Sequence, residues 1–431
     1  MPDNVGGQLL AMQFQLERSQ WLSAEALHAA QDRQLDVLLA HAGRTVPAYR
    51  ERWRAAGLDP ARITAADFSA LPIIERKDFA VGTAAFESEA CPPQHGDIYE
   101  DSTSGSLGMP LRFKATRLHA FFWHALALHA HVWHGRDLNA KLAQIRYRVG
   151  KGRAAGWGDL MNHAIRTGPL ATLPILTDVA RQLDWLVAEA PTYLQTYPSN
   201  LHALLLMARH KNIQLPSLKQ LWVFGEVMPP DLPSLAKEVW KVPVVDGYSS
   251  QECGQIALQC PDSDGYHVMA ANVRVEVLRD DGSSCVPGET GRVVITTLHN
   301  FAMPLIRYAI GDYAEVAGPC ACGRGLPHLA RIMGRSRNML RTADGRTLWF
   351  DGLPAATEGL QIVQRRLVQT HIDRFEFHYV RERELTGAEA STISARLQSS
   401  LGTTLSVTFR RHETLVSEAN GKFEDIVCQL Q

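Results

Sequence analysis

The sequence lacks three features that would point directly to a function class. Its formal net charge is −1, so no sequence-wide basic field attracts nucleic acid or an anionic membrane. Its most apolar long run, 120–133, is interrupted by His124, His129 and His131 and is too short and too polar to span a bilayer. It contains no Gly-x4-Gly-Lys-Ser/Thr run, which argues against a Walker-type ATPase.

A secretory signal, internal repeats and low-complexity tracts are also missing from the sequence. We therefore expect a cytoplasmic protein whose seven cysteines are reduced thiols, with clustered cysteines indicating metal. A hydrophobic content of 45% and a charged content of 21% are typical of a globular protein. A length of 431 residues predicts two or three domains.

Helical and strand-like patterns alternate through most of the chain. Helical spacing covers 8–56, 117–134, 179–189 and 198–208, and strand-like runs cover 192–197, 221–224 and 242–246. Polar clusters follow the last two strands directly, at Gly225 and Gly247. This alternation predicts an α/β fold with a mostly parallel sheet, whose ligands bind at the carboxyl ends of the strands.

The pattern of predicted secondary structure changes in the last third of the sequence. Residues 273–278 and 291–298 read as an antiparallel hairpin around Asp280-Asp281-Gly282. Further on, a strand at 374–380, a capping box at 386–389 opening a helix to 401, and a strand at 405–409 predict a small α+β unit. We expect a large domain over 1–335, with a β-rich subdomain at about 253–333, and a small mobile lid over 336–431.

Two segments of the large domain allow opposite interpretations. Five histidines on the predicted helix 117–134 could bind metal, but a helix face packed on the core is the better interpretation: His119, His124, His129, His131 and His134. The segment 146–174 contains five glycines and suggests a mobile stretch lining a cleft. Its cations form either a patch for an anionic ligand or a solvated loop: Arg146, Arg148, Lys151 and Arg153.

The segment 101–111 contains a dense run of small and hydroxyl-bearing residues, Ser102-Thr103-Ser104-Gly105-Ser106-Leu107-Gly108. Such a run has almost no apolar surface to bury, so it cannot form core. Its backbone N–H groups and hydroxyls can wrap an anion, although a plain Ser/Gly linker fits equally well.

Further clusters in the chain decide between these two interpretations. They are Gly247-Tyr248-Ser249-Ser250-Gln251-Glu252, the segment 303–312, Gly334-Arg335-Ser336-Arg337 and Asn420-Gly421-Lys422-Phe423. With the hydroxyl-rich loop, they make the sequence resemble the adenylate-forming acyl/aryl ligase superfamily, and within it the phenylacetate–coenzyme A ligase-like branch. The resemblance extends from Val46-Pro47-Ala48-Tyr49 to Lys422, and the ordered set of motifs is specific although each alone is weak.

The resemblance implies an ATP- and Mg²⁺-dependent activation of a carboxylic acid. The loop residues Ser102, Thr103, Ser104, Gly105, Ser106 and Gly108 would bind the β- and γ-phosphates. Glu252 would bind Mg²⁺, a hard cation suited to carboxylate and phosphate oxygens. Lys422 would bridge the reacting carboxylate and the α-phosphate.

The same resemblance implies the nucleoside contacts and the hinge. Asp312 would accept hydrogen bonds from both ribose hydroxyls, with help from Arg335. The adenine would lie beside two short segments: Gly225, Glu226 and Val227, and Gly247, Tyr248 and Ser249. Two departures from the family pattern stand out. Leu107 replaces the usual Thr, and Arg337 occupies the hinge position, where Asp or Lys is usual and where Arg can serve as an exposed pivot.

Cysteine spacing raises a separate question of metal binding. Cys260 and His267 flank one predicted turn, and Cys320-Ala321-Cys322-Gly323 supplies two more thiols. Three sulfurs and one nitrogen would make a closed, structural zinc site, which some members of the branch carry. Free thiols are the alternative, and Cys253 is an alternative fourth ligand.

The expected substrate is a small aromatic acid such as phenylacetate, benzoate or an aminobenzoate. Its pocket would be lined by Tyr147, Trp157, Tyr197, Pro198, Ser199, Gly225, Gly247 and Tyr248. The acyl group would pass to coenzyme A or, as the alternative, to the phosphopantetheine thiol of an acyl carrier protein. A homodimer is a further expectation, and a non-catalytic nucleotide-binding scaffold is the rival from another class.

Overall fold

The computed structural model describes residues 4–79, 82–103, 110–342, 344–415 and 422–430. The chain forms two compact units. The first comprises Met1–Asn139, Gly156–Gly168 and Gly247–Met333, and the second comprises Ala140–Ala155, Pro169–Asp246 and Gly334–Gln431. Within the described ranges, no helix combines the length and the apolar character that a bilayer span requires.

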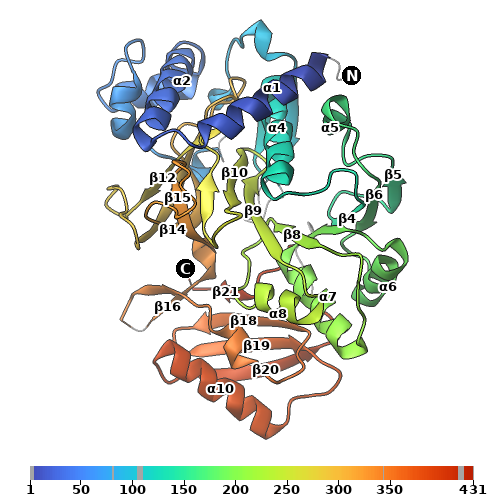
Figure 1. The fold of residues 1–431 in the computed structure, drawn as a ribbon. Coiled ribbons are helices and arrows are strands. Elements are labelled where there is room, and N and C mark those ends of the chain that lie inside the picture. The colour runs from blue at the N-terminus through green and yellow to red at the C-terminus, as the bar shows by residue number, and fades with distance from the viewer. Residues whose placement is uncertain (1–3, 80–81, 104–109, 343, 416–421, 431) are drawn as a thin grey trace. The chain divides into compact units, whose positions relative to one another are not determined.

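The first unit combines helices with a largely antiparallel sheet (Figure 1). Its helices are α1 (Asn4–Ser19), α2 (Ala24–Thr45), α3 (Pro47–Ala55), α4 (Arg117–Trp133) and α5 (Asp159–Ala164), with short 3-10 helices at Ala65–Ala70, Arg76–Phe79, Ala84–Phe86 and Pro93–His95. The strands run in the order β12 (Val273–Leu278), β13 (Thr290–Thr297), β14 (Tyr308–Val316), β15 (His328–Arg335), β11 (Tyr266–Val268), β10 (Gly254–Gln259) and β9 (Val244–Ser250). The predicted hairpin is confirmed, because β12 and β13 pair in antiparallel register from Val273 opposite Thr297.

Two short pairings flank this sheet. Strand β1 (Ile74–Glu75) pairs in parallel with β14, and β2 (Ile98–Ser102) forms a separate antiparallel hairpin with β3 (Arg112–Thr116). The apolar side chains of α2, α3 and the sheet share one core, in which Tyr49, Trp53 and Tyr308 are almost completely buried.

The second unit contains the parallel sheet that the alternating pattern predicts. Strands β8 (Gln220–Phe224), β7 (Tyr193–Thr196), β4 (Leu142–Arg146) and β6 (Leu170–Pro174) are parallel neighbours, and β5 (Gly152–Ala154) joins β6 in antiparallel fashion. Alternate strand residues such as Ala143, Ile145 and Val223 pack in one core with the apolar faces of three helices, α6 (Val179–Glu189), α7 (Pro198–Lys211) and α8 (Leu232–Val239).

The C-terminal part of the second unit has its own sheet and core. Its strands run in the order β20 (Ser406–His412), β19 (Arg374–Val380), β18 (Gln364–His371) and β21 (Ile426–Cys428), and α10 (Gly387–Leu401) lies along them (Figure 1). The predicted capping box is confirmed, because Thr386 and Glu389 cap α10 reciprocally. Smaller elements precede this sheet: a 3-10 turn at Ser336–Asn338, β16 (Met339–Arg341), β17 (Thr347–Trp349) and α9 (Leu353–Ala356). The domain boundary at 335/336 stays a prediction.

Two local predictions differ from the structure. The strand predicted to end at residue 246 continues as β9 through Ser250, so Gly247, Tyr248 and Ser249 lie in the strand and not beyond its end. The glycine-rich segment 146–174 contains β5, α5 and β6. The glycine-rich sequence did not predict these elements, because tertiary contacts fix the conformation of the segment. For example, the Trp157 N–H donates to Thr167 Oγ1 at 2.7 Å.

Candidate active site

The hydroxyl-rich loop connects the two strands of the β2–β3 hairpin, in which Ser102 pairs with Arg112. At its first residue, the Thr103 hydroxyl accepts hydrogen bonds from Arg76 Nη2 at 2.7 Å and from the Leu111 N–H at 2.9 Å. Because both contacts use the oxygen, the hydroxyl hydrogen of Thr103 remains able to donate. Ser104, Gly105, Ser106, Leu107 and Gly108 lie outside the described residues.

The predicted magnesium ligand Glu252 is 4% exposed. Burial, together with the nearby Glu252 carboxylate, raises the pKa values of Tyr308 and Cys253. Arg76 also lies close to Tyr308, so one cation and one carboxylate occupy the same buried region as Thr103. A carboxylate in this setting suits a hard cation shared with phosphate oxygens, which is the fit that Mg²⁺ requires.

Two predicted nucleoside ligands lie in direct contact. The Tyr248 hydroxyl on β9 donates to Asp312 Oδ2 on β14 at 2.7 Å. This contact fixes one carboxylate oxygen of Asp312 and orients the other. Asp312 lies within β14.

In the second unit, Gly225 allows Lys422 and Tyr197 to approach the end of β8. Gly225 has φ +80°, and a Cβ placed on it would lie 3.3 Å from Tyr197 Cε1 and 3.5 Å from Lys422 Cε. Any larger residue would combine an unfavourable backbone conformation with these tight contacts. The predicted catalytic lysine thus lies beside an aromatic residue of the predicted substrate pocket.

Glu226 connects three parts of this site. Its Oε2 accepts from the Ser199 N–H at 2.9 Å, and its Oε1 accepts from Ser199 Oγ at 3.0 Å and from the Phe423 N–H at 2.7 Å. Burial raises the pKa of Glu226 to about 7, against the opposing effect of these donors and of Lys422. The carboxylate therefore joins the start of α7 to the residue that follows Lys422.

The predicted hinge residue is not an exposed pivot. Arg337 Nε donates to Glu424 Oε1 at 2.9 Å, its Nη2 also pairs with Glu424, and both side chains are about three-quarters buried. Arg366 adds a hydrogen bond to the Glu424 carbonyl at 2.7 Å and lies over the Phe423 ring at 4.4 Å. Residues 422–424 are therefore held by three separate side chains, Glu226, Arg337 and Arg366.

The remaining predicted residues are divided between the two units. Gly334, next to Arg335, has φ +89°, and a Cβ on it would lie 2.6 Å from Val227 Cγ2, so these two segments are in close contact. Tyr147 donates its N–H to the Tyr197 hydroxyl at 3.4 Å, and the Tyr197 ring contacts Phe224. Pro198 and Ser199 begin α7. Trp157 belongs to the first unit, where it is buried against the His131 ring.

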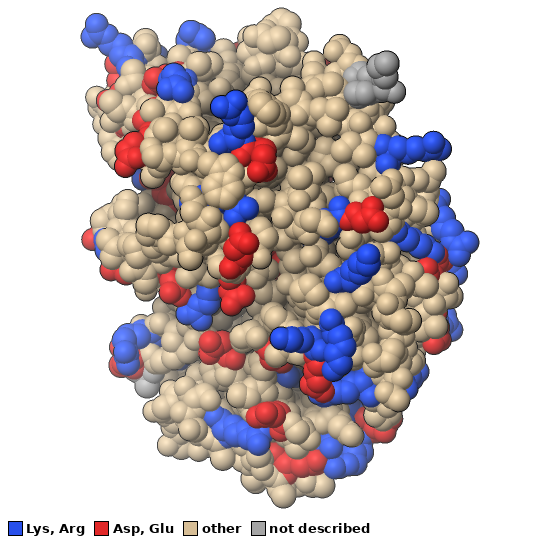
Figure 2. Space-filling model, viewed as in Figure 1, with Lys and Arg blue, Asp and Glu red and all other residues tan. Residues whose placement is uncertain are grey.

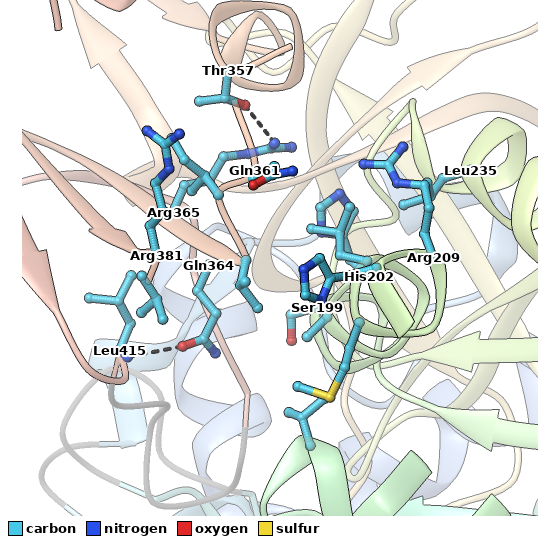
Figure 3. A pocket seen from close by; sticks show the side chains of 18 of the residues that line it. Ser199, His202, Arg209, Leu235, Thr357, Gln361, Gln364, Arg365, Arg381 and Leu415 are labelled. Atoms are coloured by element: carbon cyan, nitrogen blue, oxygen red, sulfur yellow. Dashed lines mark hydrogen bonds between the residues drawn. The ribbon is translucent and has the colours of Figure 1, made fainter. Parts of the chain in front are cut away.

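A large pocket of about 2070 Å³ lies in the second unit between α7 and α8 on one side and the C-terminal sheet on the other. Figure 3 shows side chains from both sides pointing into it, including His202, Arg365 and Gln364. Asp231 joins the two sides, since its Oδ2 lies 3.3 Å from His202 Nε2 and 3.4 Å from Arg365 Nη2. Ser199 and Phe423 also line the pocket, so it reaches the Glu226 cluster.

The four predicted zinc ligands converge in the first unit. The ligand atoms of Cys260, His267, Cys320 and Cys322 lie within 4.8 Å of one another, and no other group of this kind occurs among the described residues. Cys260 Sγ and Cys320 Sγ are 3.9 Å apart, close to the roughly 3.8 Å that tetrahedral zinc–sulfur bonds require. Burial lowers the pKa of His267 to about 4, so its imidazole is neutral, as a metal ligand must be. Cys253 is buried elsewhere and does not belong to this group.

The histidines of α4 do not form a metal cluster within the described part of the chain. His119, His129 and His131 are buried. Burial lowers the pKa values of all five, to about 4 for His119 and His129 and to about 3 for His134. They are neutral residues of a packed helix, as the sequence indicated.

Sequence reasoning missed several residues of the site. Arg76 and Tyr308 accompany Thr103 and Glu252, and Arg366 and Glu424 accompany Lys422. Glu226 was assigned to the adenine loop, but its carboxylate contacts Ser199 and Phe423. No spacing rule could have found these contacts, because the partners are separated by up to 232 positions in the chain. On the face shown in Figure 2, positive and negative side chains are interspersed, so charge distribution does not mark the site there.

The sequence pattern of the AMP-binding enzyme family matches residues 154–303. The chain is 26% identical over 338 residues to the phenylacetate–coenzyme A ligase of Thermus thermophilus, covering 74% of this chain and 72% of that protein. It is 25% identical over 332 residues to the enzyme of the same name from Escherichia coli, covering 74% and 73%.

Solved structures agree on the fold. A 2-hydroxyisobutyryl–coenzyme A ligase with a bound acyl-adenylate superposes with a TM-score of 0.75 at 21% identity, covering 96% of this chain and 92% of that one. An anthranilate–coenzyme A ligase with bound anthranoyl-AMP superposes with a TM-score of 0.60 at 17% identity, covering 76% and 65%. The family match and these relatives show that the chain is similar to AMP-binding enzymes and, among them, to phenylacetate–coenzyme A ligases.

Proposed function

We propose that the protein activates a small aromatic carboxylic acid as its acyl-adenylate and transfers the acyl group to coenzyme A. The observation that carries this proposal is the position of Lys422, whose stem lies against Gly225 beside Tyr197. A lysine so placed at the carboxyl ends of parallel strands suits two anions that must approach each other.

In the first half-reaction, a carboxylate oxygen of the acid attacks the α-phosphorus of ATP, and the bond to pyrophosphate breaks. The Lys422 ammonium would offset the repulsion between the carboxylate and the phosphate as they approach. Glu226 would act as a positioning residue, because its bond to the Phe423 N–H fixes the backbone next to Lys422.

The phosphates and the metal are assigned to the first unit. Thr103 would donate its free hydroxyl hydrogen to a phosphate oxygen, with Ser102, Ser104, Gly105, Ser106 and Gly108 completing the loop. Glu252 would hold Mg²⁺, which supplies charge neutralisation for the departing pyrophosphate. Arg76, which already donates to Thr103, adds a cation close to this position.

The nucleoside is assigned to the residues that the resemblance implies. Asp312, oriented by Tyr248, would accept hydrogen bonds from the ribose hydroxyls, and Arg335 would assist. The backbone of Gly225, Glu226 and Val227 and that of Gly247, Tyr248 and Ser249 would border the adenine. The acid would lie along Tyr147, Tyr197, Pro198 and Ser199, with Trp157 as a further assigned residue.

In the second half-reaction, a thiol attacks the carbonyl carbon of the adenylate, and AMP leaves. Coenzyme A is favoured over an acyl carrier protein as the source of this thiol, because the relatives found by sequence are all named as coenzyme A ligases. The contacts of Arg337 with Glu424 lie at the predicted hinge, so their rearrangement would accompany the change between half-reactions. The homodimer and the cytoplasmic location stay predictions.

We further propose that Cys260, His267, Cys320 and Cys322 hold one structural zinc ion. Their atoms surround a common centre, and Arg324 supports them from outside, since its N–H donates to Cys322 Sγ at 3.5 Å and its guanidinium to Asp262 at 2.8 Å. Four protein ligands leave no open position for a substrate, so the ion would stabilise the fold and not take part in the reaction.

ATP–pyrophosphate exchange over a panel of aryl and aliphatic acids tests the proposed function. Exchange should depend on an added aromatic acid and on Mg²⁺, and coenzyme A should convert the adenylate to a thioester. Absence of exchange with every acid, in protein that remains folded and binds ATP, would favour the non-catalytic scaffold. Thioester formation on a carrier protein but not on coenzyme A would replace the proposed acceptor.

A further inference from the structure

Arg146 is a cation of the second unit to which the proposed reaction assigns no role. It ends β4, whose neighbours β6 and β7 are both parallel to it. Its side chain is half-buried, and its Nε is buried and has no hydrogen-bond partner among the described residues. A buried guanidinium N–H without a partner is unfavourable, because it loses its hydration without gaining a hydrogen bond.

The cations that follow Arg146 in the sequence have different surroundings. Arg153 pairs with Glu189, its Nη2 lying 2.7 Å from the carboxylate, and Lys141 pairs with the same carboxylate. Lys151 is exposed to solvent. Arg146 therefore differs from Lys151 and Arg153, because its Nε is buried and has no hydrogen-bond partner among the described residues.

Tyr197 lies near both Lys422, which approaches Gly225 beside it, and the end of β4, where Tyr147 follows Arg146. Lys422 and one edge of the ring both approach Gly225. The Tyr197 hydroxyl accepts the Tyr147 N–H, and the Arg146 charge opposes the rise that burial causes in the Tyr197 pKa. A small acid whose reacting carboxylate lies at Lys422 can thus extend along Tyr197 towards Arg146.

A second polar atom supports a polar ligand on this part of the sheet. The Gln195 side chain on β7 is 6% exposed, and its Oε1 has no hydrogen-bond partner among the described residues. Its register partner on β4 is Gln144, two residues before Arg146 and therefore on the same face of the strand. A hydroxyl group could accept from Arg146 and donate to Gln195, whereas a carboxylate could only accept.

We propose that Arg146 binds an oxygen substituent of the substrate, remote from the reacting carboxylate, so that the preferred acid is an aromatic acid bearing a hydroxyl or a second carboxylate. This inference rests on the proposed function and names its substrate class. Arg146 is then a specificity-determining residue, and the substrate supplies the hydrogen-bond partner that its buried Nε–H lacks. A site built in this way rejects an analogue that lacks the partner group, because the guanidinium stays unsatisfied.

The test compares matched acids in ATP–pyrophosphate exchange: phenylacetate, 3- and 4-hydroxyphenylacetate, and 4-carboxyphenylacetate. The wild type should prefer at least one substituted acid by about 100-fold in kcat/KM. Arg146→Met, which keeps an apolar stem, should reduce that preference to less than about fivefold and leave exchange with phenylacetate within about threefold. Arg146→Lys should restore part of the preference, and Lys151→Met, an exposed cation of the same segment, should leave it unchanged.

Each outcome has a distinct meaning. If the wild type prefers a hydroxyl-substituted acid and Gln195→Met also removes this preference, the hydroxyl bridges Arg146 and Gln195. If it prefers the carboxyl-substituted acid and Gln195→Met leaves this preference unchanged, the second carboxylate forms an ion pair with Arg146. Exchange that is equal for substituted and unsubstituted acids in the wild type overturns the inference while the proposed function holds. An equal loss for all acids in Arg146→Met, in protein with an unchanged Tm, also overturns it, because Arg146 would then act on the reacting carboxylate. Failure of exchange with every acid would instead contradict the proposed function.

Discussion

Replacing Glu226 by Gln tests whether this carboxylate positions Lys422. The three groups that approach its two oxygens can all donate: Ser199 N–H to one, and Ser199 Oγ–H and Phe423 N–H to the other. An amide presents one oxygen and one NH2 group, so at least one backbone N–H would face another donor. Leaving one buried donor unsatisfied costs about 1–3 kcal/mol.

If that cost falls on the contact with Phe423, the 422–424 segment loses its anchor to the start of α7. We therefore expect Glu226→Gln to slow adenylation by about 10- to 100-fold, because each 1.4 kcal/mol changes a rate about tenfold. Thioester formation from preformed acyl-adenylate should change less than threefold, since Lys422 serves the first half-reaction. Pyrophosphate exchange and single-turnover thioester formation measure the two steps separately.

The matched control is Glu238→Gln on α8, where the carboxylate is 59% exposed and lies 3.5 Å from Arg209. This change should leave both half-reactions unaffected. Equal losses in the two half-reactions of Glu226→Gln, or none in either, would refute the positioning role. A lower Tm that accounts for the whole loss of activity would refute it as well.

The remaining predictions concern pH, the lysine, the zinc group and the hinge. Burial raises the pKa of Glu226 from 4.5 in the unfolded chain to about 7, so its protonated form is favoured on folding. Its contribution of about 3 kcal/mol to stability should be present below pH 4.5 and lost as the pH rises through 7. The Tm of the wild type should therefore fall relative to that of Glu226→Gln over this interval, and a constant difference would show that the shift is absent. Lys422→Ala should abolish pyrophosphate exchange and spare transfer from preformed adenylate; normal exchange would remove the lysine from the reaction. Metal analysis should find about one zinc per chain, and Cys322→Ser should lose it together with thermal stability; metal-free protein of unchanged Tm would exclude the site. Arg337→Ala, which breaks the pairing with Glu424, should impair thioester formation more than adenylation, and the opposite order in single-turnover assays would contradict a hinge role.

Much of the fold follows from periodicity that can be read locally. The helix Val179–Glu189 and the hairpin of β12 and β13 have regular apolar spacing and clear end signals, so they were predicted almost to the residue. The glycine-rich segment 146–174 has no such spacing, and β9 continues through Gly247 although glycine is a poor strand residue. In both places pairing with distant strands, and not local preference, determines the structure.

The sequence by itself indicated the resemblance to adenylate-forming ligases, because ordered motifs can be recognised without any knowledge of distances. It also identified Cys260, His267, Cys320 and Cys322 as a group, since ligand chemistry restricts which residues can share a metal. Only the tertiary structure decided that Glu226 contacts Phe423, that Arg337 pairs with Glu424, and that the buried Arg146 Nε has no hydrogen-bond partner among the described residues. The physical reason is that partnership and burial depend on which side chains converge from distant parts of the chain, and residue type and spacing do not encode that convergence.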